Sequence, residues 1–575
     1  MPDTEFPRPS FIDAVGHSYN RRGKRVILLT GNVLDQFWSP RLRSFTPLEQ
    51  VLYQELRDKF LVLRVDAASG ISFYDTADEQ ELLKVCQLAE HIASKGQKLG
   101  DVEAQMAQTQ HQPLPMLILL RGMSNAVTRL WAGDKSRFRP LGLIMQFAGS
   151  LFPDGDFDRL SELDRQRLVT FLNWINDPFF SKNGNVILLV SDTKSEINRR
   201  VLALPVTEHV EIPLPSATER AHFVTQYGEV CTPSDAALQF ELSREAFVED
   251  TAGLKLTSLE DLLETSHRTG EPVRRRNVLE EVNLILEAEL GDVVKVNIPG
   301  HSPKDIIGSE ATTAILRSIF QRCDNSETAV SAVLVSGPNG GGKTFQMEAF
   351  ASESGRIVIE LTGLRGMWYG QTDKLFERLR WHLATYGKVL ILVDEAHTAF
   401  GSVHQSDTHE TERRLAGNII KMMGDPRFRG KVLWALMTSR PDELDPDVKS
   451  RAPLQIPIFD PEGEARQRFI QELFQRRGIA LSPEELQHVF RQTAHYSARD
   501  FDNLVREVRA QGKPVAEVLQ IWQASTAIVQ QRRLQTLIAA LHCSYPQLLP
   551  EWLRSMRTDA IQKEAEELKW ALHRT

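Results

Sequence analysis

The sequence predicts an α/β fold that occurs twice along the chain, each copy being a parallel sheet with surrounding helices and a small helical lid. Apolar, β-branched runs at residues 332–335 and 388–393 have the composition of buried parallel strands. The first run leads directly into a glycine-rich loop and a helix start, the order found in phosphate-binding domains. Similar segments also recur about 246 residues apart, so that Val186 matches Val432.

Length and composition indicate a globular protein of several domains. The chain has 575 residues, of which 42% are hydrophobic and 25% charged, and its formal net charge is -8. Such a mildly acidic chain has no overall field that attracts nucleic acid. The four cysteines are far apart and form no metal-binding pattern. No apolar leader opens the sequence and no uncharged run approaches about 18 residues, so we expect a soluble, cytoplasmic protein.

A phosphate-binding loop (P-loop) follows the first strand. It consists of Gly337, Pro338, Asn339, Gly340, Gly341, Gly342, Lys343 and Thr344. The spacing matches G-x-x-x-x-G-K-[ST], in which backbone N–H groups and the start of the next helix face a polyphosphate. We expect Lys343 to reach the β- and γ-phosphates and the Thr344 hydroxyl to ligate Mg²⁺.

A pair of acidic residues ends the second strand. Because it stands beside the P-loop, Asp394 is predicted to hold Mg²⁺ through water, and Glu395 to act as the general base toward the attacking water. The letters Asp394-Glu-Ala-His397 also match a helicase motif. A helicase of that type needs a second motor domain with its own arginine motifs, and the residues after His397 offer none.

The stretch around these motifs closely resembles the AAA ATPase family, in the pattern shared by katanin and spastin. The resemblance covers roughly residues 303–510. It is carried by the segments at 305–308, 367–400, 411–423, 432–446 and 496–501. It implies a P-loop ATPase that binds ATP and Mg²⁺, assembles into a hexamer-like ring or spiral, and grips a polypeptide in a central pore.

The resemblance also assigns residues to the base of the nucleotide and to the pore. Ile306, Ile307 and Gly308 stand where the family holds adenine. Trp368 stands at the aromatic pore position, with Tyr369 beside it. An aromatic ring gives a grip that tolerates many sequences, because it can pack against any backbone or side chain.

Five further positions depart from, or complete, the family pattern. Ser439 replaces the sensor asparagine, and Gln371 replaces a glutamate after the pore glycine. The segment that supplies arginines to a neighbour's γ-phosphate is shortened, leaving Arg451 as the candidate arginine finger and Lys449 as a second positive charge. Arg499 takes the sensor-2 position. These departures are consistent with slow turnover, although the hydrolytic residues are intact.

The first copy keeps the strands but loses the chemistry. Residues 25–32 align with 332–339, yet no Gly-Lys-Thr follows them. Residues 117–120 align with the strand before the acidic pair, and this alignment puts Arg121 and Gly122 in its place. Thr257 likewise replaces the sensor-2 arginine. We therefore expect the first copy neither to hold Mg·ATP in the usual way nor to hydrolyse it. A degenerate AAA-like module before an active one resembles tandem AAA proteins of bacteria and plastids whose function is unknown.

These patterns divide the chain into six predicted parts. They are a degenerate α/β core at 1–215, its lid at 216–275, a linker helix at 276–302, the active core at 303–460, its lid at 461–511, and a C-terminal helical extension at 512–575. The basic run at 274–276 favours a solvated linker over a nucleic-acid contact.

Three functions remain open from the sequence. The leading one is an ATP-driven remodeller, a homo-oligomer that pulls on a polypeptide substrate, with no membrane role. The second is a nucleotide-gated assembly or scaffold protein with slow turnover. The third, a nucleic-acid motor or loader, is disfavoured because no basic helix or base-stacking platform is present.

Overall fold

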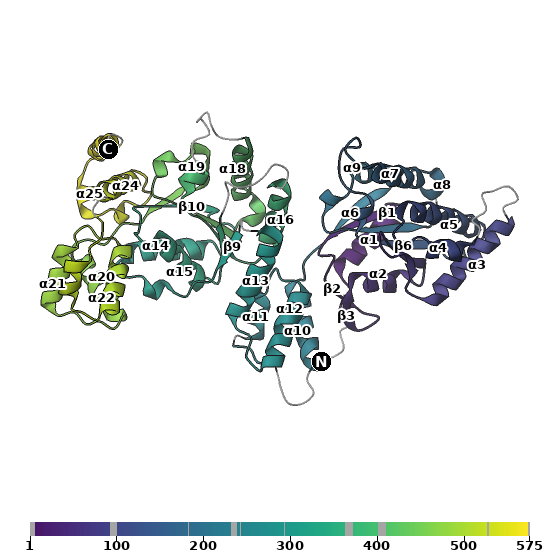
Figure 1. Cartoon of the computed structure of the whole chain (residues 1–575), viewed down its shortest axis with the longest axis horizontal. Coiled ribbons are helices and arrows are strands. Elements are labelled where there is room, and N and C mark those ends of the chain that lie inside the picture. Colours follow the sequence, from purple (N-terminus) through teal and green to yellow (C-terminus); the bar gives the residue numbers. More distant parts are fainter. Residues whose placement is uncertain are drawn as a thin grey trace. The chain divides into compact units, whose positions relative to one another are not determined.

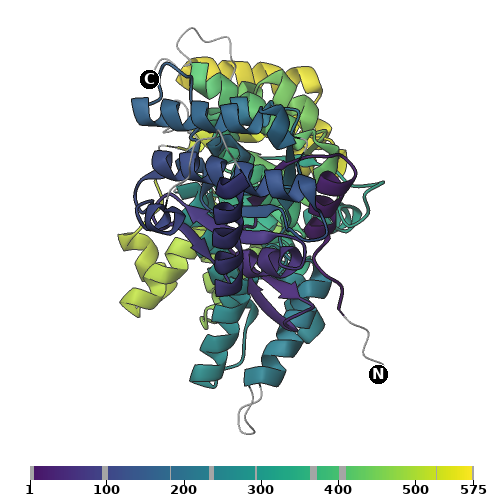
Figure 2. The ribbon, with the colours of Figure 1, turned by 90° about the vertical axis from the view of Figure 1, so that its right-hand side faces the viewer.

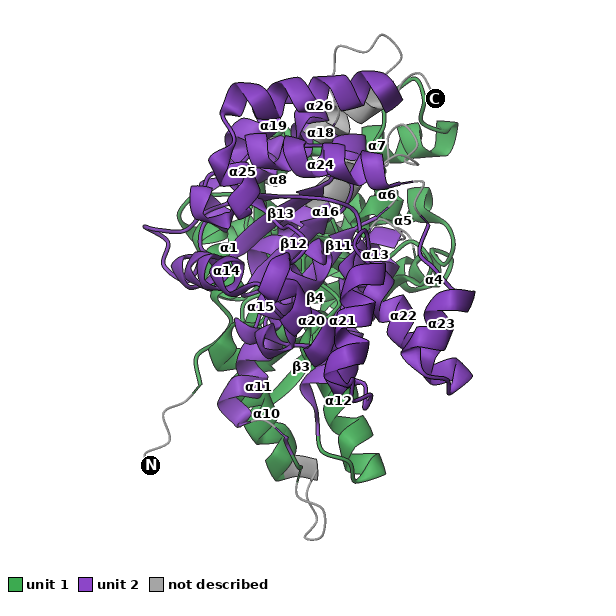
Figure 3. Ribbon diagram, turned by 90° about the vertical axis from the view of Figure 1, so that its left-hand side faces the viewer, with its two compact units in different colours: residues 1–239, 254–272 green, residues 240–253, 273–575 purple. Residues whose placement is uncertain are grey.

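The computed structural model describes most of the chain, and the chain forms two compact units (Figures 1 and 3). The described residues are 6–92, 101–181, 183–231, 238–241, 243–291, 294–362, 372–400, 410–525 and 528–572. The first unit comprises residues 1–239 and 254–272, and the second comprises 240–253 and 273–575. Among the described residues, no helix combines the length and apolarity needed to cross a membrane.

The first unit is built on a six-stranded sheet in the order β5-β4-β6-β7-β1-β8. Its strands are β1 (Val26–Gly31), β4 (Leu61–Asp66), β5 (Gly70–Phe73), β6 (Leu141–Met145), β7 (Val186–Val190) and β8 (Thr207–Ile212). All neighbours pair in parallel except β4 and β5. A hairpin of β2 (Gln36–Ser39) and β3 (Ser44–Pro47) follows β1.

Helices cover both faces of this sheet (Figures 1 and 2). They are α1 (Ser10–Asn20), α2 (Leu48–Leu56), α3 (Thr76–Ile92), α4 (Val102–Ala107), α5 (Pro113–Gly133), α6 (Ala148–Leu151), α7 (Glu162–Ile175), α8 (Pro178–Ser181) and α9 (Arg199–Leu202). The unit also contains the lid helices α10 (Ala217–Cys231) and α12 (Leu256–Thr269), which pack on each other. Because strand side chains alternate, Val26 and Leu28 pack with α3, α5 and α7, whereas Ile27 and Leu29 pack with α1 and α2.

The second unit has a sheet of the same size, in the order β14-β10-β13-β12-β11-β9. Its strands are β9 (Val294–Asn297), β10 (Ala332–Ser336), β11 (Ile357–Leu361), β12 (Val389–Val393), β13 (Val432–Thr438) and β14 (Leu454–Pro457). Its helices are α11 (Arg244–Asp250), α13 (Arg275–Leu290), α14 (Glu310–Arg322), α15 (Lys343–Glu353), α16 (Thr372–Thr385), α17 (Ala396–Ala399), α18 (Glu410–Met423), α19 (Pro446–Arg451), α20 (Gly463–Arg476), α21 (Pro483–Gln492), α22 (Ala498–Gln511), α23 (Val515–Ile521), α24 (Val529–Leu541), α25 (Glu551–Ser555) and α26 (Thr558–Leu572).

The two sheets have one topology. Strands β8-β1-β7-β6-β4 correspond in order to β14-β10-β13-β12-β11, and every one of these pairs is parallel. An antiparallel sixth strand closes each sheet, although β5 follows β4 in the chain and β9 precedes β10. The predicted α/β fold with a parallel sheet is confirmed, and the shared order supports a duplication.

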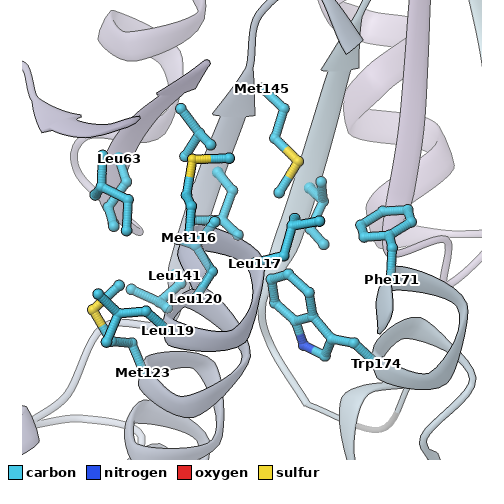
Figure 4. Close-up of a cluster of buried hydrophobic side chains, with 14 of the residues drawn as sticks. Leu63, Met116, Leu117, Leu119, Leu120, Met123, Leu141, Met145, Phe171 and Trp174 are labelled. Atoms are coloured by element: carbon cyan, nitrogen blue, oxygen red, sulfur yellow. The ribbon is translucent and has the colours of Figure 1, made fainter. Parts of the chain in front are cut away.

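One strand alignment made from the sequence is wrong. Residues 117–120 lie within α5, where Leu117 and Leu120 pack against β6 and Trp174 (Figure 4). The strand that corresponds to β12 is β6, so Gln146 and Phe147 follow it in place of the acidic pair. A short apolar run on a buried helix has the same letters as a buried strand, which explains the error.

The remaining predicted boundaries stay predictions, but several expected helices are present. The expected linker helix is α13, and helices α23 to α26 occupy the C-terminal extension. The basic run at the start of α13 pairs with carboxylates: Arg274 with Glu241 and Arg275 with Asp250. The linker interpretation of the basic run stays a prediction.

Candidate active site

A cavity of about 890 Å³ opens in the second unit, at the edge of the sheet where β10, β12 and β13 end. The carboxyl ends of parallel strands are where α/β domains bind ligands. The residues predicted from the sequence that line this cavity are Ile306, Ile307, Asn339, Gly340, Gly341, Gly342, Lys343, Thr344, Asp394, Glu395, Ser439 and Arg499. Segments up to 193 residues apart in sequence thus meet at one place.

The P-loop joins β10 to α15 through left-handed backbone. Gly337, Gly340 and Gly342 have φ angles of +141°, +82° and +86°, a region that glycine enters without steric cost. A Cβ on Gly340 would stand 2.8 Å from Oγ of Ser497 at the start of the lid helix α22. Glycine therefore lets the lid approach the loop and leaves the loop's backbone accessible to a polyphosphate.

Lys343 folds onto its own loop. Its Nζ donates hydrogen bonds to the carbonyl oxygens of Gly337 at 3.0 Å and Pro338 at 3.1 Å. Burial lowers the pKa of Lys343 to about 8, and the nearby carboxylates of Asp394 and Asp460 oppose that shift. A polyphosphate beside the ammonium would favour its charged form further.

Asp394 and Glu395 stand where β12 ends, exposed to the cavity. The N–H of Glu395 donates to Oδ1 of Asp394 at 2.8 Å. Glu395 has a φ of +45°, which is uncommon for a residue with a side chain and often marks a functional turn. Thr344 lines the same cavity, so a hydroxyl and a carboxylate oxygen are present together, the donor types that Mg²⁺ prefers. These residues fit a Mg²⁺ ion held by Thr344 and Asp394.

The sensor loop is tied to the acidic turn. Ser439 is 8% exposed and lines the cavity directly after β13. The preceding Thr438 places its Oγ1 2.9 Å from Nδ1 of His397, and accepts a hydrogen bond from the N–H of Arg440 at 2.9 Å. Burial lowers the pKa of His397, so the neutral ring can accept the Thr438 proton. The hydrogen bond between Thr438 and His397 therefore couples the position of the loop after β13 to that of the turn after β12.

The lid reaches the cavity through backbone hydrogen bonds. The N–H of Arg499, at the start of α22, donates to the carbonyl oxygen of Gly340 at 3.3 Å. The guanidinium of Arg476 in α20 donates to the carbonyl oxygens of Asp305 and Lys304, both at 2.9 Å. The lid is thus bonded both to the P-loop and to the segment predicted to hold adenine.

That segment forms an apolar end of the cavity. Ile306 and Ile307 line it together with Phe469 from α20, a surface suited to a flat, apolar ring. Gly308 adjoins them with a φ of +71°, and a Cβ there would stand 3.3 Å from the carbonyl oxygen of Ala465. Its role is to let the lid approach, rather than to line the cavity.

Among the described residues, the predicted Gly337, Pro338, Lys449 and Arg451 do not line this cavity. Arg451 is exposed in the last turn of α19, where a Cβ on Gly424 would stand 3.0 Å from its Nη1. It is not among the lining residues of its own chain's cavity. Trp368, Tyr369 and Gln371 lie outside the described residues.

Comparisons with known proteins agree with this geometry. Residues 2–213 match the family model of an AAA+ chaperone N-terminal Rossmann-like domain. Residues 333–459 match the model described as ATPase family associated with various cellular activities (AAA). The chain therefore contains a domain of the AAA ATPase family. Its second unit contains the ATPase domain, the kind of domain that binds ATP.

Related AAA proteins come from plants and animals. The chain is 30% identical to ATPase family AAA domain-containing protein FIGL1 of Arabidopsis thaliana, over 33% of this chain and 28% of that protein. It is 26% identical to Fidgetin-like protein 1 of Homo sapiens, over 39% and 35%. It is 27% identical to Spastin of Anopheles gambiae, over 37% and 27%. The chain thus spans about a third of the length of these curated relatives.

Sequence motifs do not point to three residues that lie beside the P-loop or pair with a residue there. Arg532 and Gln535 come from α24, and Asp460 follows β14. Gln535 bonds to the P-loop and Arg532 pairs with Asp460. No motif points to them, because α24 lies almost 190 residues after the P-loop; only the path of the folded chain brings it there.

The corresponding place in the first unit is filled by side chains. A void of only about 10 Å³ lies there, and its lining includes Phe37 and Trp38, both buried. The carboxylate of Asp35 accepts hydrogen bonds from the backbone N–H groups of Leu256 and Thr257, each at 3.0 Å. A side chain of the first unit therefore caps the lid helix α12 at the end where the second unit presents Arg499.

Proposed function

We propose that this chain is an ATP-hydrolysing AAA mechanoenzyme that assembles into a ring or spiral and remodels or threads a protein substrate. The observation that carries the proposal is the 890 Å³ cavity, which brings the P-loop, the acidic pair, the sensor residue and the lid to one surface. Each of these parts has a separate task in phosphoryl transfer.

The hydrolytic step would use residues of the second unit. P-loop N–H groups and the Lys343 ammonium would hold the β- and γ-phosphates. Glu395 would accept a proton from the attacking water, and Ser439 would orient that water or the γ-phosphate. Thr344 and Asp394 would hold Mg²⁺, which when bound neutralises charge that develops on the phosphate oxygens. Arg499, from the lid, would respond to the nucleotide's presence.

Assembly would complete the site. Arg451 is exposed and absent from the cavity of its own chain, as an arginine finger that serves a neighbouring subunit must be. A finger stabilises the charge that develops on the transferred phosphoryl group. This arrangement supports a ring or spiral in which each nucleotide lies between two subunits.

Action on a polypeptide rests on Trp368 and Tyr369 at the pore position, and on the chaperone-type description of the first domain. We expect Trp368→Ala to spare basal ATP hydrolysis and to abolish remodelling of an unfolded model protein. If remodelling survives that substitution, the pore role is wrong.

The test of the enzyme is Glu395→Gln, with Phe147→Gln as the matched control. Both residues follow equivalent strands with the same left-handed turn, so the two substitutions alter one backbone position in two modules. Loss of the general base should lower the turnover of ATP at least about a hundredfold, while ATP binding and oligomer size are retained. Phe147→Gln should leave turnover within about twofold. Equal turnover in wild type and Glu395→Gln would contradict the mechanism.

The second candidate is a nucleotide-gated scaffold with incidental turnover. The filled first unit favours it, because half of the molecule then serves as a fixed platform. Negligible hydrolysis with and without added polypeptide, together with ATP-dependent assembly, would select this candidate.

A further inference from the structure

The C-terminal segment, residues 529–572, contacts the P-loop beside the cavity of its own unit. In α24, Oε1 of Gln535 accepts a hydrogen bond from the backbone N–H of Asn339 at 3.0 Å. Gln535 is 3% exposed, so water competes little for this N–H. Asn339 belongs to the P-loop. One donor of the loop is therefore fixed by the tail.

One turn earlier on α24, Arg532 bridges the sheet and the lid. Its Nη2 pairs with the carboxylate of Asp460 just after β14, and its Nη1 donates to the carbonyl oxygen of His495 at 3.2 Å. His495 precedes the lid helix α22, which carries Arg499. The Arg532 side chain is only 10% exposed. Its charge-assisted contacts are therefore stronger than an exposed ion pair.

Asp460 in turn lies against the P-loop, since a Cβ on Gly341 would stand 3.9 Å from its Oδ1. Arg532 therefore pairs with a carboxylate that borders the P-loop. Removing the guanidinium would leave the partly buried Asp460 carboxylate beside the P-loop without its cation, which would cost binding energy for an anion.

The rest of the segment is anchored to the same domain. The N–H of Ser544 donates to the carbonyl oxygen of Gln455 on β14 at 2.9 Å, and Leu548 packs into the core beside the sheet. Lys569 in α26 pairs with Asp442, three residues after Ser439, at 3.0 Å. The tail thus contacts the P-loop, the segment that leads into α22, and the segment that follows Ser439.

We propose that α24 is a built-in part of the ATP site, in which Gln535 and Arg532 are positioning residues that couple docking of the C-terminal segment to nucleotide binding. This inference rests on the proposed ATP binding of the second unit. Coupling is reciprocal: a tail that positions the loop and lid raises affinity for ATP, and bound ATP holds the tail in place.

The experiment compares Arg532→Gln with Arg533→Gln in the full chain. Arg533 is the next residue of the same helix, but it pairs with Glu564 and stacks on Trp552 within the tail. We expect Arg532→Gln to raise the Kd for a fluorescent ATP analogue about tenfold, and Arg533→Gln to leave it within about twofold. Gln535→Met, which keeps the volume but removes the acceptor, should raise the Kd about threefold to tenfold, and it keeps the inference testable if Arg532→Gln fails to fold.

Two further readouts separate positioning from simple stability. Asp460→Asn combined with Arg532→Gln should weaken binding less than the product of the two single effects, because the two residues act as a pair. In the wild-type protein, a non-hydrolysable ATP analogue should slow hydrogen exchange of the α24 amides, and Arg532→Gln should abolish that slowing. Wild-type protein that binds no ATP would overturn the proposed function itself. Wild-type binding with unchanged affinity in both Arg532→Gln and Gln535→Met would overturn this inference alone.

Discussion

The turns after β6 and after β12 share a backbone and differ in chemistry. Phe147 has a φ of +49° and Glu395 a φ of +45°. One turn further on, the N–H of Phe152 donates to the carbonyl oxygen of Ala148 at 2.9 Å. The N–H of Phe400 likewise donates to the carbonyl oxygen of Ala396 at 2.8 Å. The strained turn therefore belongs to the shared scaffold, and only the side chain decides whether it serves hydrolysis. Phe147 leaves the first turn with an apolar group that is 58% exposed.

The turns after β1 and β10 also share a backbone and differ in chemistry. Gly31 and Gly337 both have positive φ, and a Cβ would stand 2.6 Å from the carbonyl oxygen of Ile212 in one unit and 2.1 Å from that of Ile458 in the other. Both positions need glycine for the close approach of two strands. Only the second unit continues with residues that face a phosphate, whereas the first continues with Asp35, which binds its own lid helix.

Among these substitutions, we expect the greatest loss of ATP turnover at Arg451, the candidate arginine finger of the second unit. Arg451→Ala should lower ATP turnover about a thousandfold, because the finger would stabilise the transferred phosphoryl group. The exposed Arg427, which pairs with Asp425, supplies the control, and Arg427→Ala should leave turnover unchanged. Mixing Arg451→Ala with Lys343→Ala subunits should restore activity, since each supplies what the other lacks. Normal turnover of Arg451→Ala would remove this residue from the site.

A smaller effect is expected in the first unit. Asp35→Ala leaves two N–H groups at the start of α12 without their acceptor, and should lower the free energy of unfolding of this unit by about 2–3 kcal/mol. Thermal unfolding and hydrogen exchange of residues 256–269 would measure it. Asp58→Ala, at an exposed aspartate paired with Arg41, should change neither. An unchanged lid helix in Asp35→Ala would show that the carboxylate is not what closes this unit.

The smallest effect concerns pH and only the second unit. Because burial lowers the pKa of Lys343 to about 8, the ammonium that would meet the phosphates is lost as pH rises through that value. Bound phosphates favour the charged form, so ATP affinity should fall roughly tenfold between pH 7 and pH 9. Lys343→Arg, which does not titrate in this range, should show a flatter profile. Equal slopes for the two proteins would exclude Lys343 as the titrating group.

Much of the scaffold could be predicted from the sequence. The strands at β10, β12 and β13 are continuous apolar runs that lead into recognisable loops. The repeat correctly matched β1 with β10 and β7 with β13, but it did not find β6, the partner of β12. The alignment at Leu117–Leu120 failed because helix α5 is buried on one side by the sheet. A short apolar run in such a helix cannot be distinguished from a buried strand by its sequence.

The candidate site was predictable only where a local motif specifies it. The P-loop and the acidic pair are contiguous, so their spacing alone predicts their chemistry. Arg532 and Gln535 reach the site through the fold of the tail around β14, which no local pattern encodes. The sealing of the first unit likewise depends on side chains such as Trp38 packing into the space, a matter of volume rather than of motif. Arg451 stays a prediction, because its partner would lie on another subunit.

Calorimetric titration of the full chain with a non-hydrolysable ATP analogue and Mg²⁺ measures how many of the two modules bind ATP. We predict one site per chain in the wild-type protein and none in Lys343→Ala. A second site per chain, or a site that persists in Lys343→Ala, would place nucleotide in the first unit and contradict the account.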